Sequence, residues 1–354
     1  MKTSDLLNQI ISRKASDLHL VPGYPPILRI DGKLIPLLGA DILTKTEIDL
    51  LIKEITPPSL LKNFSEDLEI DFSFSFGGNN RFRANLYHQK GDAAIALRLL
   101  APEAKTIQDL HLPGICVDFC NARQGFILIT GPTGSGKTTT IAAIISEINR
   151  NQRKHIITIE DPIEYIFLPE KSLISQREIR QDTHSWARAL RSALREDPDI
   201  VVVGEMRDLE TISAALTVAE TGHLVFATLH TNSASQTIDR IVDVFPEESQ
   251  QQTRIQLAGT LTGIISQRLV PAIGQGRFPA CEILIADDAV RNIIREGKTH
   301  LLGNIIATSA DAGMITLDAS LAGLVKEGKV ERTEARNFSL RPEEFDRQLG
   351  GEKV

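Results

Sequence analysis

Hydrophobic and polar residues follow two different spacing patterns along the chain, and the pattern changes near residue 125. Beyond this point, short runs rich in Val and Ile are separated by longer segments with helical spacing. Uninterrupted apolar runs of this length are typical of parallel strands that helices cover on both faces. The predicted strands are FILIT (126–130), HIITIE (155–160), DIVVVGE (199–205) and HLVFATLH (223–230). The pattern therefore predicts an α/β domain.

The first hundred residues show shorter elements of mixed type, interrupted by Pro, Gly and Asn. This mixture predicts a small α+β domain. Ser4 or Asp5 is the predicted N-cap of its first helix. The predicted elements are helices at 4–15 and 44–55, extended segments at 17–23 and 25–37, strands at 69–76, 81–89 and 93–100, and turns at 31–32 and 77–80.

Residues 100–121 have weak periodicity and two prolines, which indicates a linker that contains one short helix. After residue 246 we predict mostly helices, including residues 251–269, 289–296 and 316–326. The predicted organisation is an N-terminal domain at 1–100, a linker at 101–121, an α/β core at 122–275 and a helical C-terminal region at 276–354.

Composition narrows the possible partners. The chain has 354 residues with 39 Lys and Arg against 46 Asp and Glu, a net charge of −7 at pH 7. This balance disfavours a nucleic-acid partner, which a basic surface would attract. The 3 Cys residues are too few for a disulfide framework or a paired zinc site. No apolar run is long enough to span a bilayer, and we expect a cytoplasmic protein.

The glycine-rich stretch GPTGSGKTT at 131–139 fits the pattern G-x-x-x-x-G-K-[ST] and falls between a predicted strand and a predicted helix. In such a loop, backbone N–H groups surround phosphates, the Lys reaches the β- and γ-phosphates, and the hydroxyl ligates Mg²⁺. We therefore predict that ATP and Mg²⁺ bind here; a chance glycine-rich loop is the alternative. The predicted nucleotide-binding residues are Gly131, Pro132, Thr133, Gly134, Ser135, Gly136, Lys137, Thr138 and Thr139, with Thr138 also a metal ligand.

The apolar run of the third predicted strand ends in Gly204 and Glu205, where a Walker B strand usually ends in Asp. Gly204 offers no carboxylate. Glu205 is therefore the predicted residue that holds the water shell of the metal or orients the attacking water. Alternatively, Glu205 only begins a helix, where the helix dipole favours an acid.

Three acids, Glu160, Asp161 and Glu164, follow the second predicted strand at its C-terminal end, where open α/β sheets bind ligands. Asp161 precedes a proline, which favours an extended backbone over a helix cap. We predict that these acids face Mg²⁺ or the attacking water, with Glu160 and Asp161 as metal candidates. A solvated turn is the alternative.

His223 and His230 bracket the fourth predicted strand. If both lay in the strand, their spacing would place them on opposite faces, so they could not share a metal. His230, at the C-terminal end, is the predicted sensor of the γ-phosphate. The role of His223 stays open between structural and functional.

Three arginines of the N-terminal domain fall on predicted strands: Arg81 and Arg83 share one face of a strand, and Arg98 lies on the next. They are either solvated or paired with acids such as Glu69 and Asp71, or they supply positive charge to a triphosphate as arginine fingers. From the residues alone, pairing is favoured.

The segment AVRNIIRE at 289–296 has helical spacing, with apolar residues on one side and Arg291 and Arg295 four residues apart on another. The simplest interpretation is a surface helix that docks its apolar side and leaves both arginines in solvent.

Taken together, these motifs resemble in order and spacing the Walker A, Asp-box, Walker B and His-box motifs of secretion-type hexameric ATPases (the GspE/PilB/PilT/VirB11-like superfamily). The match is most similar to type IV pilus retraction ATPases of the PilT type, and it extends over nearly the whole chain. AVRNIIRE is similar to their signature A-I-R-N-L-I-R-E, which is associated with retraction. The resemblance makes this helix a coupling element.

The resemblance implies a PAS-like N-terminal domain, a RecA-like ATPase domain and nucleotide bound between them. It assigns the attacking water to Glu205 and Glu164, and it brings Arg81, Arg83 and Arg98 to the nucleotide, against the pairing favoured above. It implies a homohexamer at the cytoplasmic face of the inner membrane, associated with the membrane only through partners. Those partners are a PilC-like platform protein and other pilus ATPases.

Three functions remain open at this stage. The first is a motor that retracts type IV pili. The second is a type II secretion or pilus-assembly ATPase, and the third is an accessory nucleotide-binding subunit with little turnover. The intact Lys137 and Glu205 disfavour the third.

Overall fold

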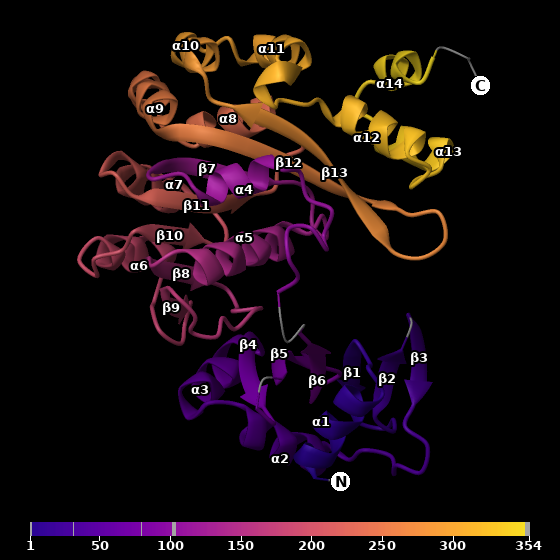
Figure 1. The fold of residues 1–354 in the computed structure, drawn as a ribbon. Coiled ribbons are helices and arrows are strands. Elements are labelled where there is room, and N and C mark those ends of the chain that lie inside the picture. Colours follow the sequence, from indigo (N-terminus) through magenta and orange to yellow (C-terminus); the bar gives the residue numbers. More distant parts are fainter. Residues whose placement is uncertain (1, 31, 79, 101–103, 351–354) are drawn as a thin grey trace. The chain divides into compact units, whose positions relative to one another are not determined.

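The computed structural model describes residues 2–30, 32–78, 80–100 and 104–350 (Figure 1). The chain divides into two compact units. The first comprises Met1–Glu103 and Asp161–Phe167, and the second comprises Ala104–Glu160 and Leu168–Val354. Within the described ranges, no helix has both the length and the apolar character needed to cross a membrane.

The first unit is a six-stranded antiparallel sheet with helices packed on one of its faces. Its strand order is β3-β2-β1-β6-β5-β4. The strands are β1 (Asp17–Leu20), β2 (Ile27–Ile30), β3 (Lys33–Pro36), β4 (Glu69–Phe76), β5 (Asn80–Gln89) and β6 (Asp92–Leu99). The helices are α1 (Thr3–Ser12), α2 (Lys45–Ile55) and α3 (Pro58–Asp67). The predicted α+β character is therefore confirmed.

Alternation along the strands explains this arrangement. Phe82 and Leu86 of β5 are fully buried and share a core with Ile10 of α1 and Ile48 of α2. Thr44 caps α2 through a capping box with Glu47. The predicted cap of α1 is wrong, because that helix already begins at Thr3 and has no side-chain cap.

Two predicted turns lie partly outside the described residues. The turn at 31–32 includes Asp31, and the turn at 77–80 includes Asn79. The first residues of the predicted linker, 101–103, are also outside the described ranges. The rest of that linker belongs to the second unit and contains the predicted short helix, α4 (Ile115–Cys120).

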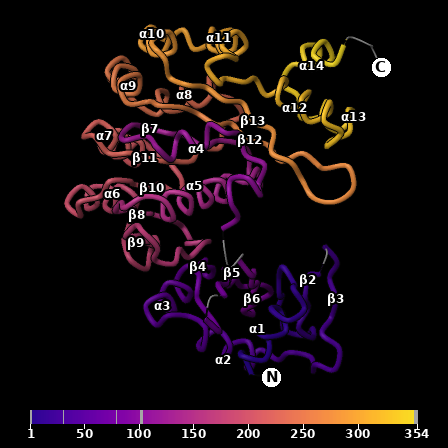
Figure 2. Tube along the Cα trace, viewed as in Figure 1, coloured from indigo at the N-terminus to yellow at the C-terminus, as the bar shows by residue number. Residues whose placement is uncertain are grey.

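The second unit is built around a seven-stranded sheet of order β13-β12-β7-β11-β10-β8-β9. All neighbouring strands are parallel except β12 and β13, which form an antiparallel pair visible as the long orange hairpin in Figures 1 and 2. The strands are β7 (Gly125–Thr130), β8 (His155–Glu160), β9 (Leu173–Glu178), β10 (Ile200–Val203), β11 (Leu224–Leu229), β12 (Leu261–Pro271) and β13 (Arg277–Ile285). The four predicted parallel strands are confirmed, and β9 was missed.

Helices cover this sheet in layers. In one layer α7 packs against both α6 and α9, and in another α4 packs against α5. With crossovers of the usual right hand, this strand order places α5 on the opposite face from α6 and α7. These helices are α5 (Lys137–Asn151), α6 (Trp186–Ala193), α7 (Leu209–Glu220), α8 (Ala234–Asp243) and α9 (Glu247–Thr260).

The remaining chain packs beside β12 and β13 as a set of short helices (Figure 2). They are α10 (Asp288–Glu296), η1 (Thr299–Leu301), α11 (Leu302–Thr308), η2 (Ala310–Ala312), α12 (Leu317–Lys326), α13 (Arg332–Phe338) and α14 (Pro342–Gln348). The predicted helices at 289–296 and 316–326 are confirmed as α10 and α12.

One stretch differs from its prediction. Residues 261–269 belong to β12 and not to a helix, and the predicted helical region at 276–354 begins with β13. The apolar run at 261–265 suits either element, and its pairing with β7 decides the outcome. Gly263 fits this strand because a Cβ there would lie 2.3 Å from Cζ of Phe119. The predicted domain boundaries themselves stay predictions.

All three cysteines, Cys116, Cys120 and Cys281, are buried and unpaired. Burial raises the pKa of the Cys116 and Cys120 thiols to about 12 and also raises the pKa of Cys281. Buried thiols of this kind pack as small apolar core residues.

Candidate nucleotide-binding site

The glycine-rich loop lies between β7 and α5, as the phosphate-binding pattern requires. Gly131, Gly134 and Gly136 have positive φ values of 145°, 78° and 89°. A Cβ on Gly131 would lie 2.3 Å from the carbonyl oxygen of Gln267, so no other residue fits there. The loop therefore has the geometry that a phosphate cradle needs.

Two side chains of the loop are suited to receive phosphate oxygens. The Ser135 hydroxyl is buried and has no hydrogen-bond partner among the residues that the structure describes. Lys137 Nζ donates to the carbonyl oxygens of Gly131 at 2.9 Å and Pro132 at 3.2 Å, which holds the ammonium group over the loop. Burial lowers the pKa of Lys137, and the nearby Glu205 carboxylate opposes this shift. An unpaired buried hydroxyl and a partly desolvated ammonium group both favour an incoming anion.

Thr138 and Thr139 occupy the first turn of α5. The Thr138 side chain is exposed at the helix N-terminus, where free backbone N–H groups and the helix dipole favour anions. The next residue, Thr140, is buried and donates to Gln267.

Glu205, Arg207 and His230 form a cluster after the ends of β10 and β11. Glu205 Oε1 lies 2.6 Å from Arg207 Nε and 3.2 Å from Nε2 of His230. His230 Nδ1 lies 3.5 Å from the Thr133 hydroxyl of the loop. The structure thus brings together Glu205, His230 and the loop, which the sequence placed in one site.

His230 is poised to be neutral at physiological pH. Burial lowers its pKa, and the positive charges of Lys137 and Arg207 add to this effect, whereas Glu205 opposes it. A neutral imidazole has one nitrogen that donates and one that accepts. It can therefore bridge Glu205 and the loop.

The three acids after β8 are divided between the two units. Glu160 ends β8 in the second unit, where its Oε1 accepts from the Thr158 hydroxyl at 2.6 Å and from Gln176 Nε2 at 3.2 Å. Asp161 and Glu164 belong to the segment Asp161–Phe167, which groups with the first unit. Across the described ranges, no group of three or more His, Cys, Asp or Glu could hold a metal ion. The metal role of Glu160 and Asp161 stays a prediction.

The three arginines of the first unit lie on the predicted strands, and Arg83 is directly opposite Arg98. Both are paired with acids: Arg83 Nε lies 3.6 Å from Asp71, and Arg98 Nε lies 2.8 Å from Asp17. Pairing with acids, which the residues alone favoured, is therefore observed for these two.

Arg81 has a different environment from the other two. Its guanidinium contacts Ser73 and Ser75 and donates to the carbonyl oxygen of Ile163 at 3.2 Å. Ile163 precedes Glu164, so Arg81 anchors the segment that carries this acid.

His223 and His230 both lie just outside β11, at its opposite ends. His223 Nδ1 lies 3.0 Å from the Thr221 hydroxyl and 3.1 Å from the Val218 carbonyl oxygen. These contacts hold His223 against the end of α7, and its role stays open.

Arg291 of α10 is not a solvated residue. Its guanidinium donates to Ala258 and Gly259 at the end of α9, and to Leu261 at 2.8 Å. Its Nε also donates to Ala286 at 3.0 Å. Arg291 therefore satisfies carbonyl groups that the C-terminus of α9 leaves without helical partners.

Arg295 differs from Arg291 in its exposure and in its hydrogen-bond partners. Its side chain is exposed, and among the described residues it donates only to Asn292 on the same helix. The solvated interpretation therefore holds for Arg295 alone. The two arginines of the signature therefore have different environments.

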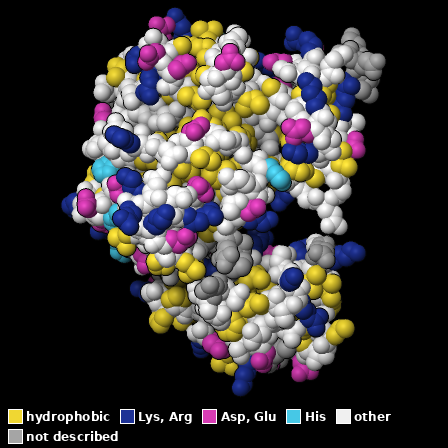
Figure 3. Space-filling view, in the orientation of Figure 1, with side chains coloured by type: hydrophobic (Ala, Val, Ile, Leu, Met, Phe, Trp, Pro, Cys, Tyr) yellow, Lys and Arg dark blue, Asp and Glu magenta, His cyan; other side chains and the backbone are white. Residues whose placement is uncertain are grey.

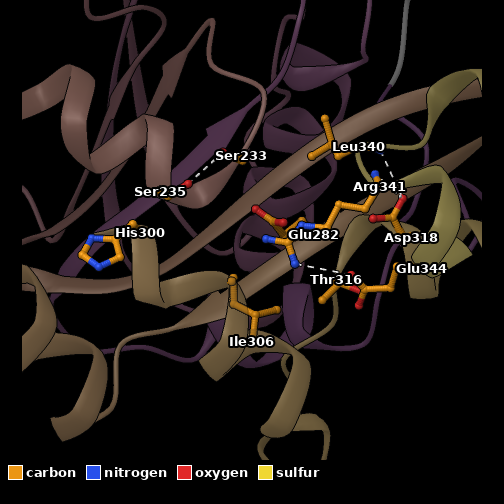
Figure 4. Close-up of a pocket in the computed structure, with 11 residues that line it drawn as sticks. Ser233, Ser235, Glu282, His300, Ile306, Thr316, Asp318, Leu340, Arg341 and Glu344 are labelled. Carbon is orange, nitrogen blue, oxygen red and sulfur yellow. Dashed lines mark hydrogen bonds and ion pairs between the residues drawn. The ribbon is translucent and has the colours of Figure 1, made fainter. Parts of the chain in front are cut away.

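A cavity of about 120 Å³ lies among α8, β13 and the C-terminal helices (Figure 4). Its wall contains the buried Glu282, whose Oε1 accepts from the backbone N–H of Ala234 at 2.7 Å. Ala234 begins α8, shortly after His230. Glu282 therefore anchors the helix that follows the histidine.

The buried Glu282 makes stability depend on pH. Burial raises its pKa above 4.5; Asp318 adds to this, while the N–H of Ala234 and the cations Arg341 and Arg268 oppose it. Because the folded form keeps this proton to higher pH than the unfolded form, the contribution of Glu282 to stability is greatest below pH 4.5 and is lost as pH rises through the folded pKa.

We expect Glu282→Gln to remove this dependence. The melting temperature of the wild type relative to the variant should fall as pH rises from 4.5 towards neutrality. Thermal unfolding of both proteins across this range measures it. A difference that is constant with pH would show that Glu282 titrates alike in the folded and unfolded states.

The family model for type II/IV secretion system proteins matches residues 2–313 of the chain. The chain belongs to this family. It is 46% identical over 345 residues to the type IV pilus retraction ATPase PilT of Pseudomonas aeruginosa, across 98% of the chain and 100% of the relative. It is 44% identical to a twitching motility protein of Neisseria gonorrhoeae, across 88% of the chain and 83% of the relative.

Among solved structures, the crystal structure of the pilus retraction motor PilT with bound ADP matches with a TM-score of 0.91 at 46% identity. The match covers 98% of this chain and 99% of that chain. The resemblance drawn from the motifs is confirmed, and this member of the type II/IV secretion system family is a P-loop ATPase.

Two residues of this secretion-family site were missed from the sequence. Arg207 follows Glu205 by two residues. Its position so close to a predicted catalytic acid could have identified it as a site residue. Gln267 contacts the loop from a position 132 residues further along the chain than Ser135, and no local pattern reveals that contact.

Proposed function

We propose that this protein is a motor that hydrolyses ATP to retract type IV pili. The observation that carries the proposal is that one unit contains both a complete phosphate loop with Glu205 and His230 and the signature helix α10. The similarity to a retraction ATPase and to a twitching motility protein over most of the chain supports the same function.

The chemistry follows from the described groups. Backbone N–H groups of the loop, Lys137 and Ser135 hold the phosphates, and the exposed Thr138 hydroxyl is the side-chain ligand available to Mg²⁺. When bound, Mg²⁺ neutralises charge on the β- and γ-phosphates. Glu205 orients the attacking water, and His230 links Glu205 to the loop near the γ-phosphate.

The first unit supplies further charge. Arg81, Arg83 and Arg98 share one face of its sheet, and we assign them to the negative charge that develops on the transferred phosphoryl group. Arg83 and Arg98 must then leave their acid partners when nucleotide binds. Glu164, on the segment held by Arg81, assists Glu205 with the water.

The proposed assembly is a homohexamer at the cytoplasmic face of the inner membrane, with a PilC-like platform protein and other pilus ATPases as partners. In this proposal the first unit is PAS-like and the second is RecA-like. Dark blue and magenta side chains are interspersed over the face drawn in Figure 3. This mixed surface supports protein partners over nucleic acid.

Two measurements test the function. Purified protein should hydrolyse ATP at steady state, and absence of turnover above background would favour an accessory subunit. In a strain that lacks the gene, we expect pili to extend and not retract, and expression of the protein should restore retraction. Loss of pilus assembly or of secretion would instead favour an assembly or secretion ATPase.

A further inference from the structure

Gln267 lies beneath the phosphate loop. The strand that carries it contains none of the nucleotide-binding motifs of this chain. Gln267 belongs to β12, which runs parallel to β7 with Ser266 beside Thr130, the last residue before the loop. Gln267 is 2% exposed. A buried amide in this position must find hydrogen-bond partners, and it finds them in the loop.

The amide of Gln267 joins the apex of the loop to the first turn of α5. Its Nε2 donates to the carbonyl oxygen of Ser135 at 2.7 Å, and its Oε1 accepts from the Thr140 hydroxyl at 2.7 Å. A Cβ on Gly136 would lie 2.9 Å from Nε2. Gln267 therefore contacts the part of the loop that surrounds the phosphates.

The bond to Ser135 sets the direction of a backbone donor. In a trans peptide, the C=O of one residue and the N–H of the next point in opposite directions. Because the carbonyl of Ser135 points at Gln267, the N–H of Gly136 points away from Gln267. This is the direction in which a phosphate loop presents its donors.

We propose that Gln267 is a positioning residue for phosphate binding, because its amide holds the Ser135–Gly136 peptide with its N–H towards the nucleotide. The proposal rests on the proposed function, since it takes the loop as the ATP site. It adds to that function that a residue of β12 contributes to the affinity of the loop for the phosphates.

The test compares three variants by calorimetric titration of the full chain with Mg-ADP, together with melting temperatures without nucleotide. Gln267→Met keeps the length of the side chain and removes both hydrogen bonds. Thr140→Val removes the bond that fixes Oε1 of the amide and keeps the bond to Ser135, so it loosens the hold on the Ser135 carbonyl without removing it. Ser266→Ala is the matched control. Ser266 precedes Gln267 on β12, and the substitution removes its buried 2.8 Å hydrogen bond to Thr130 of β7 and leaves Gln267 in place.

We expect Gln267→Met to weaken Mg-ADP binding about tenfold and Thr140→Val about threefold, whereas Ser266→Ala binds like the wild type. Each variant loses at least one buried hydrogen bond, so all three melting temperatures without nucleotide should fall. If Gln267 positions the loop, the three variants differ in their affinity for Mg-ADP; if it does not, their affinities are alike.

Wild-type affinity in Gln267→Met would overturn the proposal, and so would equal weakening by Ser266→Ala, because the effect would then be general loosening of β12. If Gln267→Met does not fold, the comparison of Thr140→Val with Ser266→Ala decides, and equal affinities overturn the proposal. A wild-type chain that does not bind Mg-ADP would contradict the proposed function instead.

Discussion

Glu205→Gln is expected to lower the steady-state rate of ATP hydrolysis by about 10³-fold, with Mg-ADP affinity close to that of the wild type. The carboxylate lies with His230 and Arg207 after the strand ends, and it is not one of the groups that hold the phosphates. The amide keeps its size and removes the charge that orients the water. Turnover and calorimetric titration of the same preparation measure the two effects.

Glu210→Gln is the matched control for this substitution. Glu210 makes the same type of contact, 3.6 Å from Arg191, but its side chain is 74% exposed. Such surface pairs contribute little, so turnover should be unchanged. Equal turnover in Glu205→Gln and the wild type would remove Glu205 from the mechanism.

Arg291→Ala is expected to lower the free energy of unfolding of the second unit by about 2–3 kcal/mol. The substitution removes hydrogen bonds to four backbone carbonyl groups and the positive charge at the C-terminus of α9. For a unit of this size, the melting temperature should fall by about 5 °C or more. Differential scanning calorimetry measures both quantities.

Arg295→Ala provides the comparison on the same helix. Its exposed guanidinium donates to Asn292 and to no other residue in the described part of the chain, so stability should change by less than about 0.5 kcal/mol. We expect this variant to hydrolyse ATP at the wild-type rate and to fail in pilus retraction, because Arg295 remains available to a partner. Normal retraction by Arg295→Ala, or normal stability of Arg291→Ala, would contradict this division of tasks.

The sequence predicts those parts of the site whose residues lie within one short stretch of chain or follow strands of the same sheet. The phosphate loop needs glycines and Lys137 at fixed spacing, so one stretch of chain defines it. Glu205 and His230 each follow a strand of the same parallel sheet, and parallel strands bring their C-terminal ends to one edge. Their meeting could therefore be predicted without a structure.

Other features depend on which segments pair in space. The run at 261–265 suits a helix or a strand, and only its position beside β7 selects the strand. The contact of Gln267 with Ser135 follows from that pairing, so it was missed with it. The two arginines of α10 look equivalent in sequence, and the end of α9 makes them different.

The burial of all three cysteines has a practical consequence for following the motor by fluorescence. Thiol reagents react with the thiolate, and the pKa values of about 12 for Cys116 and Cys120 leave almost none at neutral pH. Cys281, with its raised pKa and buried position, is equally protected. A cysteine introduced on the surface should therefore take up a maleimide dye selectively, and the native residues can stay in place during single-molecule measurements.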